Sequence, residues 1–162
     1  MFRIVFIIVL LTCVSASQKL NVRTKSGLVS GIKDSAYMFY GIPYAQPPIG
    51  SLRFRSPQSV SSWDGVLDAG KPGSICYQEQ YKGAMSEDCL FLNIFVPPSV
   101  GVGEEYLTGS YPIMIYFSGD QRFTSGGSNF LKPIYLTKSE TTQREQIIIT
   151  FNYRVGAFWI LL

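Results

Sequence analysis

The spacing of apolar and polar positions predicts a chain built mainly from strands. Near its start, apolar and polar residues alternate on either side of Lys25 to Gly27, a pattern typical of an antiparallel hairpin. The inward-facing positions of this hairpin are expected to be Leu20, Val22, Leu28 and Ile32.

Three short apolar runs follow, CLFLNIFVPP (89–98), IMIYF (113–117) and IIITFNY (147–153). They are rich in β-branched and aromatic residues and are bounded by Pro, Gly or polar residues, which is typical of strands buried on both faces of a sheet. Between the last two runs, the polar stretch from Thr137 to Gln146 is compatible with a helix. A strand, a helix and a strand in this order form a β-α-β unit, so we expect an α/β fold.

Prolines shape the segment between the hairpin and the first apolar run. Pro43, Pro47, Pro48 and Pro57 stand among aromatic residues in YGIPYAQPPIGSLRFRSPQ. Proline removes a backbone donor and breaks helices, so we expect a structured but irregular loop here.

The first 16 residues have the features of a secretory signal peptide. Arg3 precedes an apolar run from Ile4 to Leu11, and Val14 and Ala16 occupy the −3 and −1 positions of a cleavage site before Ser17. A membrane anchor is the alternative, but the run is far shorter than the roughly 20 apolar residues that span a bilayer. We therefore expect a signal peptide at 1–16, a secreted product covering 17–162 and no membrane span.

Charge and cysteine content narrow the function classes. The 162 residues carry a net charge of +3 without a run of Lys or Arg, so no basic surface for nucleic acid is expected. Removal of the signal peptide leaves Cys76 and Cys89, an even number in an oxidising compartment, which favours a disulfide over two free buried thiols. Two cysteines and no histidine are too few ligands for zinc, and we expect no metal or other cofactor.

Four motifs, in order along the chain, carry a family resemblance. They are FYGIPYAQPPIGSLRFRSPQ, SWDGVLDA, SEDCLFLNIFVP (86–97) and FNYRVGAF. The stretch from Leu20 to Phe158 resembles the N-terminal portion of the type-B carboxylesterases, the family that includes cholinesterases and neuroligins. The resemblance implies the N-terminal part of an α/β-hydrolase fold, in which an antiparallel hairpin leads into a mostly parallel sheet that is incomplete here. It also implies that Cys76 pairs with Cys89.

The residues matched by these motifs suggest a scaffold. We expect Gly41 and Pro43 to set a bend, and Asn152 and Arg154 to tie a strand end to neighbouring backbone. A further pair, Arg53 and Phe54, is expected to anchor its segment through a charge pair and a buried ring. Glu87 and Asp88 are adjacent on an extended chain and point to opposite faces, so a joint acid/base role is not expected. Glu87 is instead expected to pair with Arg53.

The candidate chemistry lies after the run IMIYF. In active relatives the corresponding strand ends in a His-Gly-Gly-Gly type turn whose N–H groups bind the oxyanion. By position, Ser118 stands at the start of this turn and Gly119, Asp120 and Gln121 occupy the oxyanion-hole positions. Side chains at 120 and 121 restrict the backbone, and a carboxylate would oppose the negative charge of the transition state, so we interpret this as a degraded oxyanion hole.

The other catalytic groups of this family are missing from the sequence. Ester hydrolysis needs a Ser on a Gly-x-Ser-x-Gly elbow, an acid and a His. The chain has no His, and its nearest approach to an elbow is Gly126-Gly127-Ser128. No catalytic residue is therefore assigned.

Three interpretations remain. In the first, the chain is a truncated form of a secreted carboxylesterase, which would bind a carboxylic ester substrate only as part of a complete domain. The second is a non-catalytic, neuroligin-like member that binds an extracellular protein partner. The third, a self-contained small binding module, is the weakest because a sheet cut this short leaves an open edge.

Overall fold

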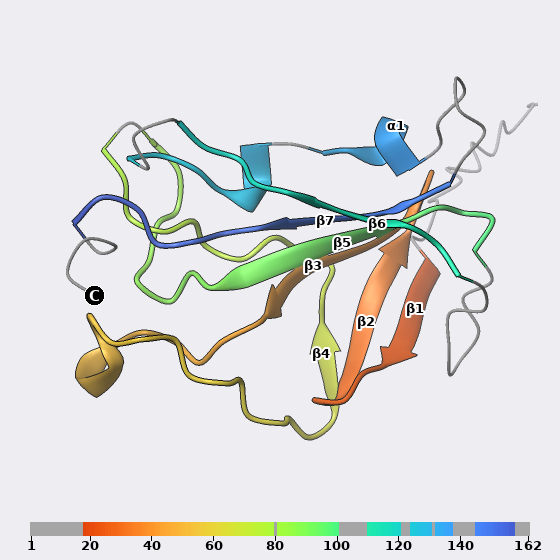
Figure 1. Ribbon diagram of the computed structural model, residues 1–162. Coiled ribbons are helices and arrows are strands. Elements are labelled where there is room, and N and C mark those ends of the chain that lie inside the picture. Colours follow the sequence, from red (N-terminus) through yellow and green to blue (C-terminus); the bar gives the residue numbers. More distant parts are fainter. Residues whose placement is uncertain are drawn as a thin grey trace, which may run out of the picture.

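The computed structural model describes residues 18–79, 81–100, 110–120, 124–130, 132–137 and 145–157. The expected signal peptide and Gln121 lie outside these residues. Seven strands form one sheet in the order β1-β2-β3-β5-β7-β6, with β4 paired to β2 (Figure 1). The strands are β1 (Gln18–Arg23), β2 (Leu28–Lys33), β3 (Tyr37–Pro43), β4 (Val66–Asp68), β5 (Phe91–Val96), β6 (Ile113–Tyr116) and β7 (Ile147–Phe151). The short helices are η1 (Gly50–Leu52), η2 (Ser128–Phe130) and α1 (Ile134–Thr137).

The N-terminal hairpin is formed by β1 and β2, as the alternating pattern predicts. Its register places Leu20 opposite Gly31 and Val22 opposite Val29, so these four residues share one face. Leu28 and Ile32 lie on the opposite face of β2, where Ile32 packs against a second buried cluster, so the four expected inward positions do not share one face. The sequence conceals this arrangement because one position on the face of Leu20 is a glycine: a Cβ on Gly31 would lie 2.5 Å from the Phe39 ring, which covers that position.

Strand β3 extends into the segment from Tyr40 to Gln58 that we expected to be a structured but irregular loop. Its residues alternate between two buried clusters: Tyr37 and Phe39 join one face of the sheet, whereas Met38 and Tyr40 join the other. The pairing with β5 shifts register between Phe39 and Ile42, and Gly41 within this bulge has φ +61°. The expected bend at Gly41 is confirmed.

The centre of the sheet supplies most of the core. One cluster contains Val29, Tyr37, Phe39, Ala69, Val96, Val100 and Ile147, and the other contains Ala36, Met38, Tyr40, Phe95 and Ile148. Ile134 of α1 packs against the second cluster, and Figure 1 shows α1 beside the sheet, near the start of β7. Each central strand is thus buried on both faces.

Antiparallel pairing continues from β1 through β2, β3 and β5 to β7, and parallel pairing follows between β7 and β6. The parallel β6–β7 pair is what the β-α-β pattern predicts. Most of the helix expected between Thr137 and Gln146 falls on residues 138–144, outside the described part, while α1 begins earlier, at Ile134.

Strand β6 differs from its expected environment. Its four residues are 60%, 41%, 53% and 40% exposed in chain order, so the prediction of burial on both faces is wrong for this strand. The reason is its place at the end of the strand order, where it pairs with β7 alone in the described part of the chain.

Candidate functional site

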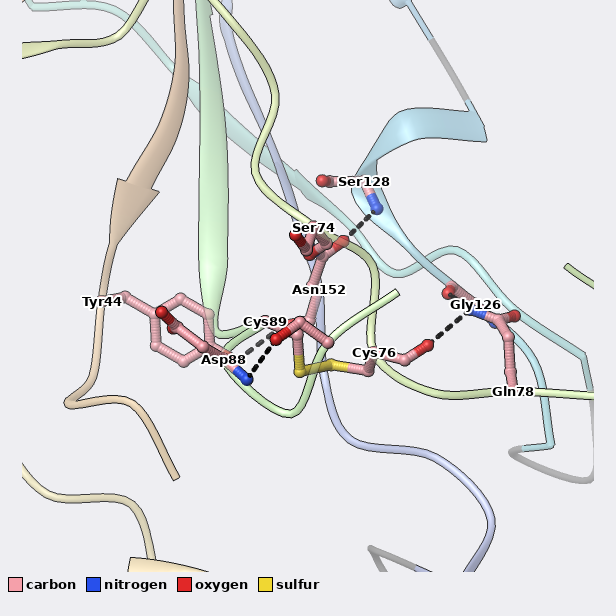
Figure 2. The surroundings of a disulfide bond; sticks show 10 residues. Tyr44, Ser74, Cys76, Gln78, Asp88, Cys89, Gly126, Ser128 and Asn152 are labelled. Carbon is pink, nitrogen blue, oxygen red and sulfur yellow. Dashed lines mark hydrogen bonds between the residues drawn. A yellow bond between two sulfur atoms is a disulfide. The ribbon is translucent and has the colours of Figure 1, made fainter. Parts of the chain in front are cut away.

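A disulfide joins the loop that precedes β5 to the residues that lead directly into this strand. Cys76 and Cys89 are bonded, with their Cα atoms 5.0 Å apart (Figure 2). Both are buried, and they pack with Ala45 and Leu90 in a small apolar cluster. The pairing that the family resemblance implied is confirmed.

Residues 118–127, here called the strand-end turn, follow β6, and residues 121–123 of this turn lie outside the described part. Ser118 anchors its start. The Ser118 hydroxyl donates to the Gly127 carbonyl (2.6 Å) and accepts from the Gly127 N–H (3.0 Å). The Ser118 carbonyl accepts a hydrogen bond from the Tyr153 hydroxyl (2.6 Å). The two ends of the turn are therefore held together.

Asp120 closes the strand-end turn from within. Its Oδ1 accepts hydrogen bonds from the N–H groups of Thr124 (2.8 Å) and Ser125 (3.3 Å), and the Thr124 hydroxyl donates to Oδ2. The Asp120 N–H in turn donates to the Ser125 carbonyl (3.2 Å). This backbone donor is thus engaged inside the turn.

Gly119 lies tightly against Tyr153. A Cβ at Gly119 would lie 2.2 Å from the Tyr153 hydroxyl oxygen, so this position accepts only glycine without rearrangement. Burial, and secondarily the negative charge of Asp120, raises the pKa of the Tyr153 hydroxyl. Tyr153 therefore keeps its proton at neutral pH and remains a hydrogen-bond donor to Ser118.

Gln78 connects the loop closed by the Cys76–Cys89 bond, here called the disulfide loop, to the strand-end turn. The Gln78 side chain accepts from the Gly126 N–H (3.0 Å) and donates to the Gly126 carbonyl (2.8 Å). Figure 2 shows Gln78, Gly126 and the disulfide together. The Gln78 amide also donates to the Cys76 carbonyl (3.2 Å). Sequence analysis missed both Gln78 and Tyr153, because their partners lie 48 and 35 residues away along the chain.

The segment after β7 ties several loops together. Asn152 is fully buried; its Oδ1 accepts from the Ser128 N–H (2.7 Å) and its Nδ2 donates to the Ser74 carbonyl (2.8 Å). Arg154 donates from Nη1 to the Arg55 carbonyl (2.9 Å). The expected structural roles of Asn152 and Arg154 are confirmed.

The predicted ion pair lies beside the disulfide. Arg53 Nε is 2.9 Å from Glu87 Oε1, and the Arg53 guanidinium is 4.8 Å from the centre of the half-buried Phe54 ring. Burial raises the pKa of the neighbouring Asp88 carboxyl. The Arg53 and Glu87 side chains line a hollow together with Pro48, Phe54, Cys76, Tyr77, Ser86, Cys89 and Arg154. Glu87 thus serves as a partner of Arg53.

Two further findings concern ligands and membranes. Among the described residues, no three His, Cys, Asp or Glu side chains are gathered in a way that could hold a metal ion. A search of the same residues for a helix long and apolar enough to span a bilayer finds none.

Comparison with known proteins gives consistent matches. The model of the carboxylesterase family matches residues 18–161. The para-nitrobenzyl esterase of Bacillus subtilis is 34% identical over 149 residues, a match that covers 86% of this chain and 28% of that protein. The juvenile hormone esterase of Tribolium castaneum is 35% identical over 152 residues, covering 86% and 24%.

A solved structure gives the same picture. The juvenile hormone esterase of Manduca sexta, with OTFP covalently attached, matches with a TM-score of 0.74 at 31% identity, covering 87% of this chain and 27% of that chain. The described sheet is thus part of an α/β-hydrolase fold. The chain spans about a quarter of the length of these relatives.

Proposed function

The chain belongs to the carboxylesterase family, and on this basis we propose that it represents the N-terminal part of a secreted protein whose longer form hydrolyses carboxylic esters. Support for the activity comes from the two esterases that it matches at 34% and 35% identity. Support for secretion comes from the signal-like residues 1–16, with 17–162 as the mature chain.

We propose that these 162 residues alone hydrolyse no ester. The observation that carries this proposal is the absence of histidine from the sequence, together with the absence of a Gly-x-Ser-x-Gly elbow. A serine without a base is a weak nucleophile at neutral pH, so covalent catalysis has no starting point.

The strand-end turn supports the same conclusion. We propose that Gly119, Asp120 and Gln121 stand at the oxyanion-hole positions. In this arrangement the Asp120 N–H already donates to the Ser125 carbonyl, and the Asp120 carboxylate would lie near the negative charge that develops on the substrate. Both effects disfavour binding of an oxyanion.

The closed turn also supports a second candidate function. A non-catalytic, neuroligin-like member that binds an extracellular protein partner has no use for an open oxyanion hole. The hydrogen bonds from Thr124 and Ser125 to Asp120 stabilise the turn as a structural loop.

An ester assay on the secreted chain tests the proposal. Residues 17–162 are expected to hydrolyse para-nitrophenyl acetate no faster than an equal mass of an unrelated protein. The matched variant is Ser128→Ala, which removes the serine nearest to an elbow pattern. The proposal would be overturned if the wild-type chain hydrolysed the ester faster than this background and Ser128→Ala lost that activity.

A second experiment separates the two candidate functions. Sequencing of transcripts past the codon for Leu162 either finds an elbow, an acid and a His, which supports the hydrolase, or finds an intact domain without them, which supports the binding protein.

A further inference from the structure

Gln78 makes three hydrogen bonds to backbone groups of two separate loops. Its side chain is half-buried and forms a two-bond ring with Gly126, one bond as acceptor and one as donor. Its Nε2 also donates to the Cys76 carbonyl, two residues before it. An amide is suited to this position because it carries a donor and an acceptor on one planar group.

Gly126, the residue that Gln78 holds, is tightly packed near the end of the strand-end turn. A Cβ at Gly126 would lie 2.6 Å from the Ser118 carbonyl oxygen and 2.8 Å from the Tyr153 hydroxyl, so the Gly126 backbone lies close to the start of the turn and to Tyr153 after β7. The adjacent Gly127 exchanges two hydrogen bonds with Ser118. A shift of Gly126 would therefore be transmitted directly to Ser118 and to the residue after it.

The loop that carries Gln78 is anchored to the sheet through the disulfide. Cys76 is bonded to Cys89, and Cys89 lies two residues before β5 begins at Phe91. A continuous chain of contacts thus runs from β5 through the disulfide and Gln78 to Gly126 (Figure 2). The disulfide loop and the strand-end turn are distant in sequence. Gln78 joins them by donating one hydrogen bond to Gly126 and accepting one from it.

We propose that Gln78 is the positioning residue of the strand-end turn: it holds Gly126, and through it Ser118 and Gly119, in register with the disulfide-anchored loop. Its importance for ester chemistry rests on the proposed function, because it depends on Gly119 to Gln121 being the oxyanion-hole positions. The mechanical role of Gln78 does not depend on that assignment.

Glutamate is the informative replacement at this position. An ionised carboxylate has the shape of the amide but only accepts hydrogen bonds, so it would face the Gly126 carbonyl without a donor. A protonated carboxylic acid regains one donor and one acceptor and can restore the pair with Gly126. Q78E is therefore expected to hold the turn at acidic pH and to release it at neutral pH.

The experiment is hydrogen exchange of the secreted full chain with its disulfide intact. The readout is the exchange rate of the amides at 125–128, divided by the wild-type rate at the same pH so that the intrinsic pH dependence cancels. In Q78M, which keeps the length of the side chain but not its hydrogen bonds, this ratio is expected to rise at least about tenfold at every pH, since three hydrogen bonds are lost, two of them with Gly126. In Q78E it is expected to rise similarly at pH 7 and to return toward one near pH 4.

The control variant is Gln58→Leu, because Gln58 is exposed and its side chain donates to the Ser56 carbonyl, only two residues away. Its ratio is expected to stay at one, as are the ratios of amides in β2 and β3 in every variant. If Q78M is not secreted, Q78E measured at both pH values supplies the comparison within one sample. Unchanged exchange at 125–128 in Q78M, or a Q78E ratio that does not respond to pH, overturns the proposal. Because no ester is used, this result is independent of the activity assay.

Discussion

Strands β5 and β6 have similar apolar sequences, FLNIFV and IMIY, but lie in opposite environments. β5 pairs with β3 on one side and β7 on the other, and Phe95 and Val96 are almost completely buried. β6 pairs with β7 alone in the described part, and its residues are 40% to 60% exposed. The comparison shows that an apolar run predicts a strand but does not predict how many of its sides are covered.

The same contrast extends to the ends of the two strands. The segment that enters β5 is fixed by the disulfide and by the Arg53–Glu87 ion pair. The turn that leaves β6 is fixed by hydrogen bonds that Gln78 and Tyr153 donate to it and by those that the Asp120 carboxylate accepts within it. A covalent bond and an ion pair therefore hold the segment before β5, whereas hydrogen bonds hold the turn after β6.

The largest expected effect comes from truncation in the centre of the sheet. Phe95 is fully buried and packs edge-to-face with Tyr40 at 5.6 Å between ring centres. Phe95→Ala is expected to lower the free energy of unfolding by about 3–5 kcal/mol. Ile115→Ala on β6, where the side chain is largely exposed, is expected to cost less than about 1 kcal/mol. Urea unfolding at low protein concentration measures both, and equal losses would contradict the distinction between centre and edge.

The turn after β6 can be tested in an active relative. Transfer of Ser118 to Gln121 into the matching turn of the Bacillus subtilis esterase is expected to lower kcat by about 10² to 10³, the effect of losing one oxyanion donor. Asp120→Gly with Gln121→Gly in the transferred segment is the control and is expected to recover much of the loss. A graft with nearly normal kcat would show that these residues form a competent oxyanion hole.

Alkaline pH tests the disulfide end of the sheet. The Tyr44 hydroxyl donates to the Asn152 carbonyl (2.6 Å), and burial, opposed by the charge of Arg154, raises the pKa of Tyr44 from 10.0 to about 12. Because the pKa is higher in the folded state, the stabilisation from neutral Tyr44 is complete below pH 10 and is lost as the pH rises through about 12.

Tyr44→Phe is expected to lower the free energy of unfolding by about 1 kcal/mol at pH 7, the value of one hydrogen bond. It is also expected to make the loss of stability above pH 10 shallower than in the wild type. The control is Tyr135→Phe, at a side chain that is 90% exposed. Urea midpoints from pH 7 to about 12 measure the effect, and identical pH profiles for wild type and Tyr44→Phe would count against this role.

The smallest effect on stability, with a clear effect on association, is expected at the β6 edge. An exposed apolar edge strand is a template for pairing with other chains. Ile115→Lys is expected to change the free energy of unfolding by less than about 0.5 kcal/mol but to reduce aggregation of residues 17–162. Val66→Lys on β4, at a position of similar exposure, adds the same charge elsewhere. Light scattering measures association, and a wild-type chain that stays monomeric and melts cooperatively would sink this prediction.

The sequence predicted those site contacts that depend on recognisable motifs. Cys76 with Cys89 and Arg53 with Glu87 followed from paired residue types and from the family pattern, and both are present. Gln78 and Tyr153 could not be predicted, because a glutamine or tyrosine in a loop has no characteristic partner in sequence. Their hydrogen bonds go to backbone groups, which every residue offers.

The sequence by itself determined the hairpin, the strands β5, β6 and β7 and the bend at Gly41, because alternation, turn residues and glycine act over a few neighbouring residues. It also determined the family, since the four motifs keep their order. The tertiary structure decided which strands lie at the centre, which buried cluster each face of β2 joins and how the strand-end turn is held. These features depend on contacts between residues tens of positions apart, such as Gln78 against Gly126 or Tyr153 against Ser118, and no local pattern encodes such contacts.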